Sequence, residues 1–351
     1  MAIAVIILFV SCVCVQGFTC RNDKAESVDW FTAYKVPRLE PESGPNPLIN
    51  GAGLFTADVD RMSWSRSSVN VTMPHGQHIG ETLAPLYENL KNPDTTFIIY
   101  NDEFPDGEWT LKYGHSKGVL AFNNTMGFWL LHSVPKFPGN ASYDYPHSGQ
   151  YYGQAGICVT FKFDQLSIIA KQLLFTSPYI YASNIPANVM QQIPELKAII
   201  AEQFVQSPPF HNIAKLTSAE GQQFIHFAKS KQFGDDLYAA LVAQVLQTDV
   251  AVESWLNGHE NLHSNCTMKS HVYNIYNVTL PEDVAFTVYH DHSKYVVSTD
   301  TASPWICVGD INREATQFKR AGGTMCLKQG DLHSTFYKSI GSTYPCKTTK
   351  N

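Results

Sequence analysis

The chain has 351 residues, 44% of them hydrophobic, which is enough to build one large core or two modest ones and excludes a disordered protein. Its formal net charge of −6 argues against a generic nucleic-acid binder at pH 7. Protonating all 13 histidines would change the formal net charge from −6 to +7. An acidic compartment would therefore favour the binding of a polyanion.

The first 17 residues form an apolar run without charge and are predicted to be a signal peptide cleaved before Phe18. A membrane anchor is the alternative, but the run is short for spanning a bilayer. No later segment has a transmembrane pattern, so we expect no stable membrane association.

The first half of the mature chain is predicted to be rich in strands. Alternating or short apolar runs predict strands over residues 29–36, 96–100, 118–122, 128–131 and 156–163. Residues 82–90 are predicted to form a short helix. Proline and glycine predict loops over residues 40–50 and 135–149.

The second half is predicted to have a helical centre. Capping residues and apolar spacing predict helices over residues 164–174, 187–204 (broken near Pro194), 217–229 and 235–246. Strands are expected again over residues 250–255 and 285–289. Helices alternating with strands indicate an α/β protein, and no linker separates independent domains.

One pattern occurs twice. Residues 115–135 and 292–312 both begin with His-Ser-Lys, continue into an apolar strand, and reach a tryptophan. Eleven residues lie between Lys117 and Trp129, and ten between Lys294 and Trp305. Internal repetition indicates a duplicated unit, and a pseudo-twofold axis would bring both copies into one cleft.

Each His-x-Lys pair is expected to place an imidazole and an ammonium on one face of a strand. One group can transfer a proton or attack while the other neutralises charge on an anion. The candidate catalytic residues are therefore His115, Lys117, His292 and Lys294. Asp291 adjoins one pair but should face the opposite side of the strand, so it is not expected to partner the histidine.

Polar turns follow both tryptophan strands. They contain His132, Asp310 and Asn312, which are candidates for orienting groups or phosphate contacts, with a purely structural role in the turn as the alternative.

Cysteines and sequons fit the secretory route. Two of the eight cysteines lie within residues 1–17, and the remaining six predict disulfides, with no CxxC spacing for zinc. Five sequons predict N-glycosylation at Asn70, Asn123, Asn140, Asn265 and Asn277.

Residues 259–263 read HENLH and match the HExxH pattern of zinc proteases. That pattern requires a helix, whereas the flanking Asn257-Gly258 and Ser264-Asn265 favour a loop. We therefore expect no metal site and no cofactor. A secreted zinc metalloprotease and a catalytically inactive secreted binding protein are kept as alternative functions.

Six segments carry a family resemblance. GHSKGV (114–119), GFWLLHSVPKFP (127–138), YGQAGICVTF (152–161), KQFGDDLY (231–238), DHSKY (291–295) and CVGDINR (307–313) resemble deoxyribonuclease II, within the phospholipase D superfamily but without its usual acidic third residue. The resemblance extends from Val28 to Cys346. Tyr295 departs from the tryptophan expected there but is still aromatic.

The resemblance implies a phospholipase D-like α/β fold: a pseudo-twofold duplicated unit with mixed sheets flanked by helices, halves of about 18–163 and 164–351. It implies a lysosomal acid endodeoxyribonuclease, with a secreted form as the alternative, that needs no divalent metal. One histidine would attack the phosphorus of DNA and the other would protonate the leaving 5′ oxygen, and a 3′-phosphate would result. We assign the attack to His292 and the protonation to His115, and the sequence itself leaves the exchange of these roles as an alternative. A lipid phosphodiesterase is the alternative activity that the phospholipase D resemblance implies. The deoxyribonuclease II resemblance also implies the disulfides Cys20–Cys158, Cys266–Cys346 and Cys307–Cys326.

Overall fold

The computed structural model describes residues 17–39 and 46–346. The predicted signal peptide lies outside the described residues except for Gly17, as does part of the predicted 40–50 loop. The rest of that loop forms a short helix α1 (Pro47–Asn50), because the side chain of Asn46 accepts a hydrogen bond from Leu48 N at its start. No helix among the described residues is long and apolar enough to cross a membrane.

The first half of the chain forms an eight-stranded antiparallel sheet of order β10-β6-β7-β8-β9-β3-β4-β5. Its strands are β3 (Trp30–Lys35), β4 (Leu54–Asp58), β5 (Ser65–Arg66), β6 (Thr96–Tyr100), β7 (Gly118–Phe122), β8 (Met126–His132), β9 (Gln154–Lys162) and β10 (Ile180–Asn184). Two short strands, β1 (Cys20–Arg21) and β2 (Ser27–Val28), pair with each other. The predicted strands of this half are all present.

The second sheet has the order β11-β12-β18-β17-β16-β13-β14-β15, with β19 also paired to β14. Its strands are β11 (His211–Thr217), β12 (Gln223–Lys229), β13 (Val250–Glu253), β14 (Val272–Leu280), β15 (Val284–Thr287), β16 (Tyr295–Ser298), β17 (Trp305–Gly309), β18 (Gly322–Lys328) and β19 (Ile340–Thr343). Only the β13–β14 pair is parallel, so this sheet is mixed.

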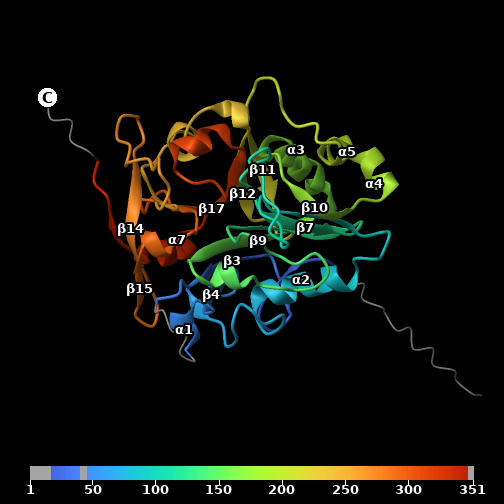
Figure 1. Ribbon diagram of the computed structural model, residues 1–351, viewed down its shortest axis with the longest axis horizontal. Coiled ribbons are helices and arrows are strands. Elements are labelled where there is room, and N and C mark those ends of the chain that lie inside the picture. Colours follow the sequence, from blue (N-terminus) through green and yellow to red (C-terminus); the bar gives the residue numbers. More distant parts are fainter. Residues whose placement is uncertain (1–16, 40–45, 347–351) are drawn as a thin grey trace, which may run out of the picture.

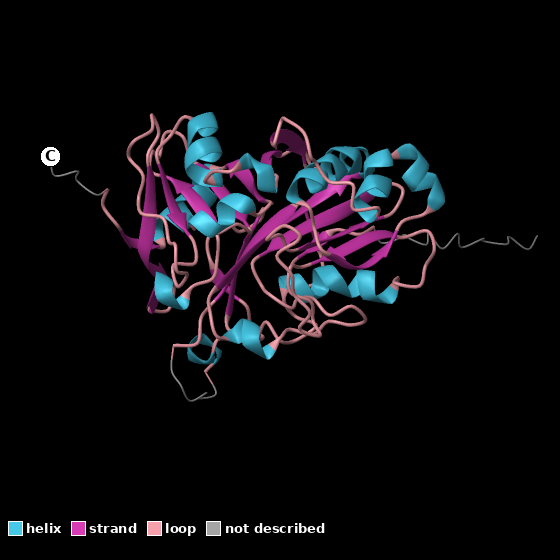
Figure 2. Cartoon of the chain, turned by 45° about the horizontal axis from the view of Figure 1, so that its top comes forward, coloured by secondary structure: helices cyan, strands magenta, loops and turns pink. Residues whose placement is uncertain are grey.

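Helices cover both sheets, and the two sheets meet in the middle of the molecule (Figures 1 and 2). Helix α2 (His78–Glu88) lies on one side of the first sheet, and α3 (Leu166–Thr176), α4 (Ala187–Gln192) and α5 (Pro194–Ile200) lie on the other. A π-helix over Tyr238–Val242 leads into α6 (Ala243–Leu246), and α7 (Gly330–Lys338) follows β18. The α/β fold with flanked mixed sheets is thus confirmed.

Alternation along the strands explains this layering. In β8, Phe128 and Leu130 pack in the core between the first sheet and α2. Trp129 and Leu131 pack in the core that the first sheet shares with the second. Side chains two apart share a face of a strand, so one apolar run serves two layers. The central strand β17 contacts β8 and β9 from the other sheet.

One predicted helix is wrong. Residues 217–229 form the turn and second strand of the β11–β12 hairpin, with Thr217 paired to Gln223. Phe224 packs in the shared core while Phe227 packs on the opposite face, which is the period of a strand. Ser218, predicted as a helix cap, instead hydrogen-bonds Asp29 and Gln222 N in the turn.

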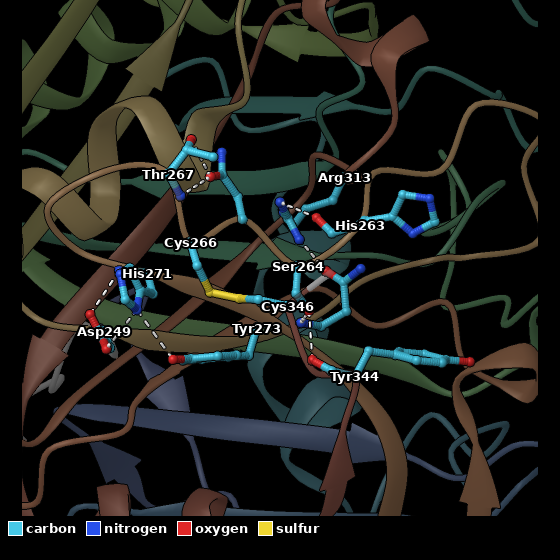
Figure 3. Close-up of a disulfide and its surroundings, with 12 residues drawn as sticks. Asp249, His263, Ser264, Cys266, Thr267, His271, Tyr273, Arg313, Tyr344 and Cys346 are labelled. Carbon is cyan, nitrogen blue, oxygen red and sulfur yellow. Dashed lines mark hydrogen bonds and ion pairs between the residues drawn. A yellow bond between two sulfur atoms is a disulfide. The ribbon is translucent and has the colours of Figure 1, made fainter. Parts of the chain in front are cut away.

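Three disulfides have the pairing that the resemblance implied: Cys20–Cys158, Cys266–Cys346 and Cys307–Cys326. Figure 3 shows Cys266–Cys346 beside Ser264, whose hydroxyl donates to the carbonyl of Tyr344 at 2.7 Å. Among the sequon asparagines, Asn140 is exposed and Asn70, Asn123, Asn265 and Asn277 are half-buried. Their glycosylation stays a prediction.

Candidate functional site

The two His-Ser-Lys segments come together. His115 lies just before β7 and His292 just before β16, and their imidazole rings lie 6.5 Å apart, edge to face. Lys117 and Lys294 are buried beside them. The four residues predicted as the catalytic set therefore share one site.

The backbone holds the two histidines in matched ways. His115 N donates to the carbonyl of Ala321 (2.8 Å), just before β18, and His292 N donates to the carbonyl of Gly153 (2.8 Å), just before β9. Because β9 and β18 are the strands after the two tryptophan strands, each half anchors the histidine of the other. The division into two pseudo-repeat halves stays a prediction, which these crossed bonds support.

The ring of His292 has a defined tautomer. Its Nδ1 lies 3.1 Å from the carbonyl of Ser133 and 3.3 Å from Oε1 of Gln154. The Ser133 hydroxyl accepts from Ala155 N and so donates to the same Gln154 oxygen, at 2.6 Å. Both neighbours of Nδ1 are acceptors, so Nδ1 carries the proton and Nε2 has a free lone pair.

A carboxylate serves the other histidine. Asp102, in the turn after β6, has Oδ2 3.6 Å from Nε2 of His115 and 3.2 Å from Nη2 of Arg320, and its Oδ1 pairs with Nζ of Lys117. Burial acts to raise the pKa of Asp102, but Lys117 and Arg320 outweigh it and leave the pKa below its usual value. This half of the site holds an ionised acid among three basic groups.

The acids near Lys294 have surroundings different from those of Asp102. The Lys294 ammonium donates to the carbonyl of His292 at 2.6 Å. Asp291 accepts from the hydroxyls of Tyr34 and Ser293 and makes no bond to the His292 ring, as predicted. Glu253 is fully buried, and burial together with the charge of Asp291 raises its pKa well above the usual value. Burial therefore favours the neutral form of Glu253 over the ionised form.

Both imidazoles are difficult to protonate. Burial lowers the pKa of His115 well below 6.5, and Lys117, Arg320 and Lys294 lower it further. Burial, Lys294, Lys117 and His115 do the same for His292. A cation costs free energy in a buried site that already holds cations, so the imidazoles are neutral until a phosphate enters or the pH falls.

The three candidates for orienting groups, Asp310, His132 and Asn312, have different surroundings. Asp310 lies within the site: burial raises its pKa to about 7, its Oδ1 accepts from Gly323 N at 2.8 Å, and the charges of Lys117 and Lys294 act on it. His132 contacts Phe137, and its Nδ1 accepts from Val134 N, beside an apolar cavity of about 20 Å³. Asn312 is buried, and its amide oxygen has no hydrogen-bond partner among the described residues.

Several site residues escaped the sequence reasoning: Asp102, Arg320, Ser133, Gln154 and Trp255. The ring centroid of Trp255 lies 5.2 Å from that of His292. Asp102 had one usable signal, because a His-x-Lys motif without its acid implies that an acid comes from elsewhere. Nothing in the sequence identifies which of the 31 acidic residues fills that role.

The HENLH segment is not helical. Residues 259–263 have irregular structure, and Figure 3 shows the carbonyl of His263 accepting from Arg313, at 3.2 Å. The two histidines therefore lack the shared helical face that HExxH zinc sites use. No group of three or more His, Cys, Asp or Glu side chains within residues 17–39 and 46–346 has the arrangement of a metal site.

Two imidazoles with separate partners and three cations define a site for acid–base and nucleophilic chemistry on an anion such as a phosphodiester. On an α/β fold of paired sheets this is the arrangement of the phospholipase D-like class. A sequence model of the deoxyribonuclease II family matches residues 19–346. The chain belongs to the deoxyribonuclease II family, whose members are hydrolases of the endodeoxyribonuclease type and part of that class.

Curated relatives are similar in sequence to this chain over nearly its whole length. Human deoxyribonuclease-2-beta is 38% identical over 336 residues, covering 94% of this chain and 92% of its own. Plancitoxin-1 of Acanthaster planci is 36% identical, covering 94% and 93%. Deoxyribonuclease-2 of Caenorhabditis elegans is 34% identical, covering 91% and 92%.

Proposed function

We propose that the chain hydrolyses DNA phosphodiester bonds in acid without a divalent metal, through a histidine nucleophile, and leaves 3′-phosphate and 5′-hydroxyl ends. The observation that carries the proposal is the meeting of the two His-x-Lys pairs, with imidazole rings 6.5 Å apart. The relatives named deoxyribonuclease-2 support DNA as the substrate.

The reaction has two steps. Nε2 of His292 attacks the phosphorus, the bond to the 5′ oxygen breaks, and His115 gives that oxygen its proton, which leaves a phosphohistidine. Water then gives a proton to His115 and attacks the phosphorus, which frees His292 and a 3′-phosphate. Lys117 and Lys294 neutralise the non-bridging oxygens in both steps.

The surroundings of the rings support these roles. His292 donates from Nδ1 to the carbonyl of Ser133, which leaves Nε2 free to attack. Asp102 lies 3.6 Å from His115 and favours its cationic form, which a general acid requires. We assign orienting roles to Gln154 and Asp310 and leave His132 and Asn312 as structural residues of their turns.

An acid optimum follows from the lowered histidine pKa values. His115 has to be protonated to donate, and burial with three nearby cations moves that protonation below pH 6.5. A bound phosphate diester offsets part of this shift because it adds a negative charge. Activity is expected to fall towards neutral pH as the general acid loses its proton, which suits a lysosomal enzyme delivered through the secretory pathway.

The test is nicking of supercoiled plasmid at pH 5 in EDTA, followed by analysis of the ends. We expect full activity in EDTA and 3′ ends that a polymerase extends only after phosphatase treatment. Complete inhibition by EDTA, or ends that are extended directly, would refute the mechanism. A single mature unit over residues 18–351 is part of the proposal, and we do not propose the metalloprotease because HENLH lacks its helix.

A further inference from the structure

Three aromatic side chains form a wall on the His292 side of the site. We call Tyr151, Tyr152 and Trp255 the aromatic wall. Trp255 bridges His292 and Tyr152, with ring centroids 5.2 Å from the first and 4.7 Å from the second, both edge to face. Tyr151 and Tyr152 are 44% and 39% exposed. Ring contacts thus run from the His292 imidazole through Trp255 to the exposed Tyr152, and Tyr151 is the neighbouring exposed ring of the same loop.

The loop that carries Tyr151 and Tyr152 is held by hydrogen bonds from a buried lysine. Lys35, on β3, is 2% exposed, and its ammonium donates to the carbonyls of Gln150 (3.1 Å) and Tyr152. Burial lowers the pKa of Lys35 well below its usual value, because burying a charged ammonium costs free energy. A buried lysine bound to loop carbonyls fixes the backbone of an exposed aromatic pair.

The ring of Tyr151 lies next to a cation and to the ring of His147. The guanidinium of Arg38 lies 4.6 Å from the centroid of the Tyr151 ring, and Arg38 N donates to the carbonyl of Tyr151 at 3.0 Å. A fixed aromatic surface next to a positive group is the combination that proteins use for single-stranded nucleic acid, where bases stack on rings and phosphates meet cations.

We propose that the aromatic wall is a nucleobase-stacking subsite for the DNA nucleotide next to the scissile phosphate, on the His292 side. The inference rests on the proposed function, since the phosphate has to lie between His115 and His292. Stacking uses the face of a base and not its edge, so the subsite accepts all four bases. It requires a base released from its pair, so the subsite acts on single-stranded or locally opened DNA.

The test uses single-stranded oligonucleotides that each contain one abasic residue, moved stepwise past a mapped cleavage position. We expect the wild-type enzyme to lose about tenfold in kcat/KM at the bond whose neighbouring base is missing, mainly through KM. Tyr152→Ala should lose about tenfold on the intact oligonucleotide and show no further loss at the abasic bond, because the stacking partner is already absent.

Matched variants separate stacking from folding. Tyr152→Phe keeps the ring and should retain wild-type KM, whereas Tyr337→Ala removes an equally exposed tyrosine (42%) on α7 and should change nothing. Equal abasic losses in wild type and Tyr152→Ala, or no abasic loss in wild type, would overturn the subsite and leave the proposed function standing. Failure of wild type to cut any oligonucleotide in EDTA would instead refute the proposed function.

Discussion

The two halves of the site share the tripeptide His-Ser-Lys and differ in the acid behind it. Near His115, the ionised carboxylate of Asp102 contacts the histidine, Lys117 and Arg320. Near His292, the acids are Asp291, bound to Tyr34 and Ser293, and Glu253, and burial raises the pKa of both. The charge of Asp102 also raises the pKa of His292, so this acid alone does not separate the two histidines. Geometry distinguishes them: Nε2 of His115 contacts the carboxylate of Asp102, whereas Nδ1 of His292 lies beside two acceptors, which leaves its Nε2 free.

The largest effects test these roles directly. His292→Ala and His115→Ala should each lose at least about 10⁴-fold in kcat on DNA, because each removes a necessary member of one unit. On thymidine 3′-(p-nitrophenyl phosphate), whose leaving group needs no proton, His115→Ala should still release a burst of about one equivalent of nitrophenol before the slow second step, and His292→Ala should release none. The reverse pattern would exchange the two roles.

The next effect concerns the ionised acid. Asp102→Asn should lose about 100-fold in kcat, the low end of what a general acid contributes. Without the carboxylate, the pKa of His115 falls further, so the high-pH limb of the rate profile should move to lower pH. Asp94→Asn, at an exposed aspartate, is the control. An unchanged pH profile in Asp102→Asn would contradict the assignment of His115 as the acid.

Disulfides offer a comparison of stability between the halves. Cys20–Cys158 includes β9 and spans 138 residues, whereas Cys307–Cys326 joins β17 to β18 and spans 19. Loop-closure entropy predicts that serine pairs at these positions lower the free energy of unfolding by about 5 and about 3 kcal/mol. Urea unfolding of the two double variants measures the difference, and a larger loss at Cys307–Cys326 would contradict this order.

The neutral acid should affect the pH dependence of stability more than the chemistry. The folded pKa of Glu253 is raised, so wild type loses stability as the pH rises above the unfolded value of about 4.3, because only the unfolded chain then releases the proton. Glu253→Gln should flatten this decline between pH 4.5 and 7.5 in urea unfolding. The exposed Glu88→Gln should follow wild type, and an equally steep decline in Glu253→Gln would contradict the raised pKa of Glu253.

The smallest effect is expected outside the candidate site, at the HENLH segment. His259→Ala changes an exposed side chain in an irregular segment, so stability should change by less than about 0.5 kcal/mol and plasmid nicking should be unchanged. Elemental analysis of purified wild type and variant completes the test. A zinc ion held by wild type and lost in His259→Ala would reopen the metalloprotease alternative.

Local patterns in the sequence determined much of this protein. Strands β6 and β7 have the bounds that their apolar runs predict, since a short apolar run between turn residues has few other structures available. The repeated His-Ser-Lys predicted which two segments come together at the candidate site, because a duplication is visible without knowledge of the fold. The disulfide pairing came from the family resemblance, not from spacing.

Only the tertiary structure decided the rest. Residues 217–229 have apolar positions compatible with a helix, and pairing with β11 and β18 made them part of a hairpin. Asp102 and Arg320 are 218 residues apart, and Lys35 lies 117 residues from the Tyr152 carbonyl that it holds. Such pairs depend on which strands become neighbours. That choice is made by burial of apolar faces across the whole chain, so no local pattern of charges records it.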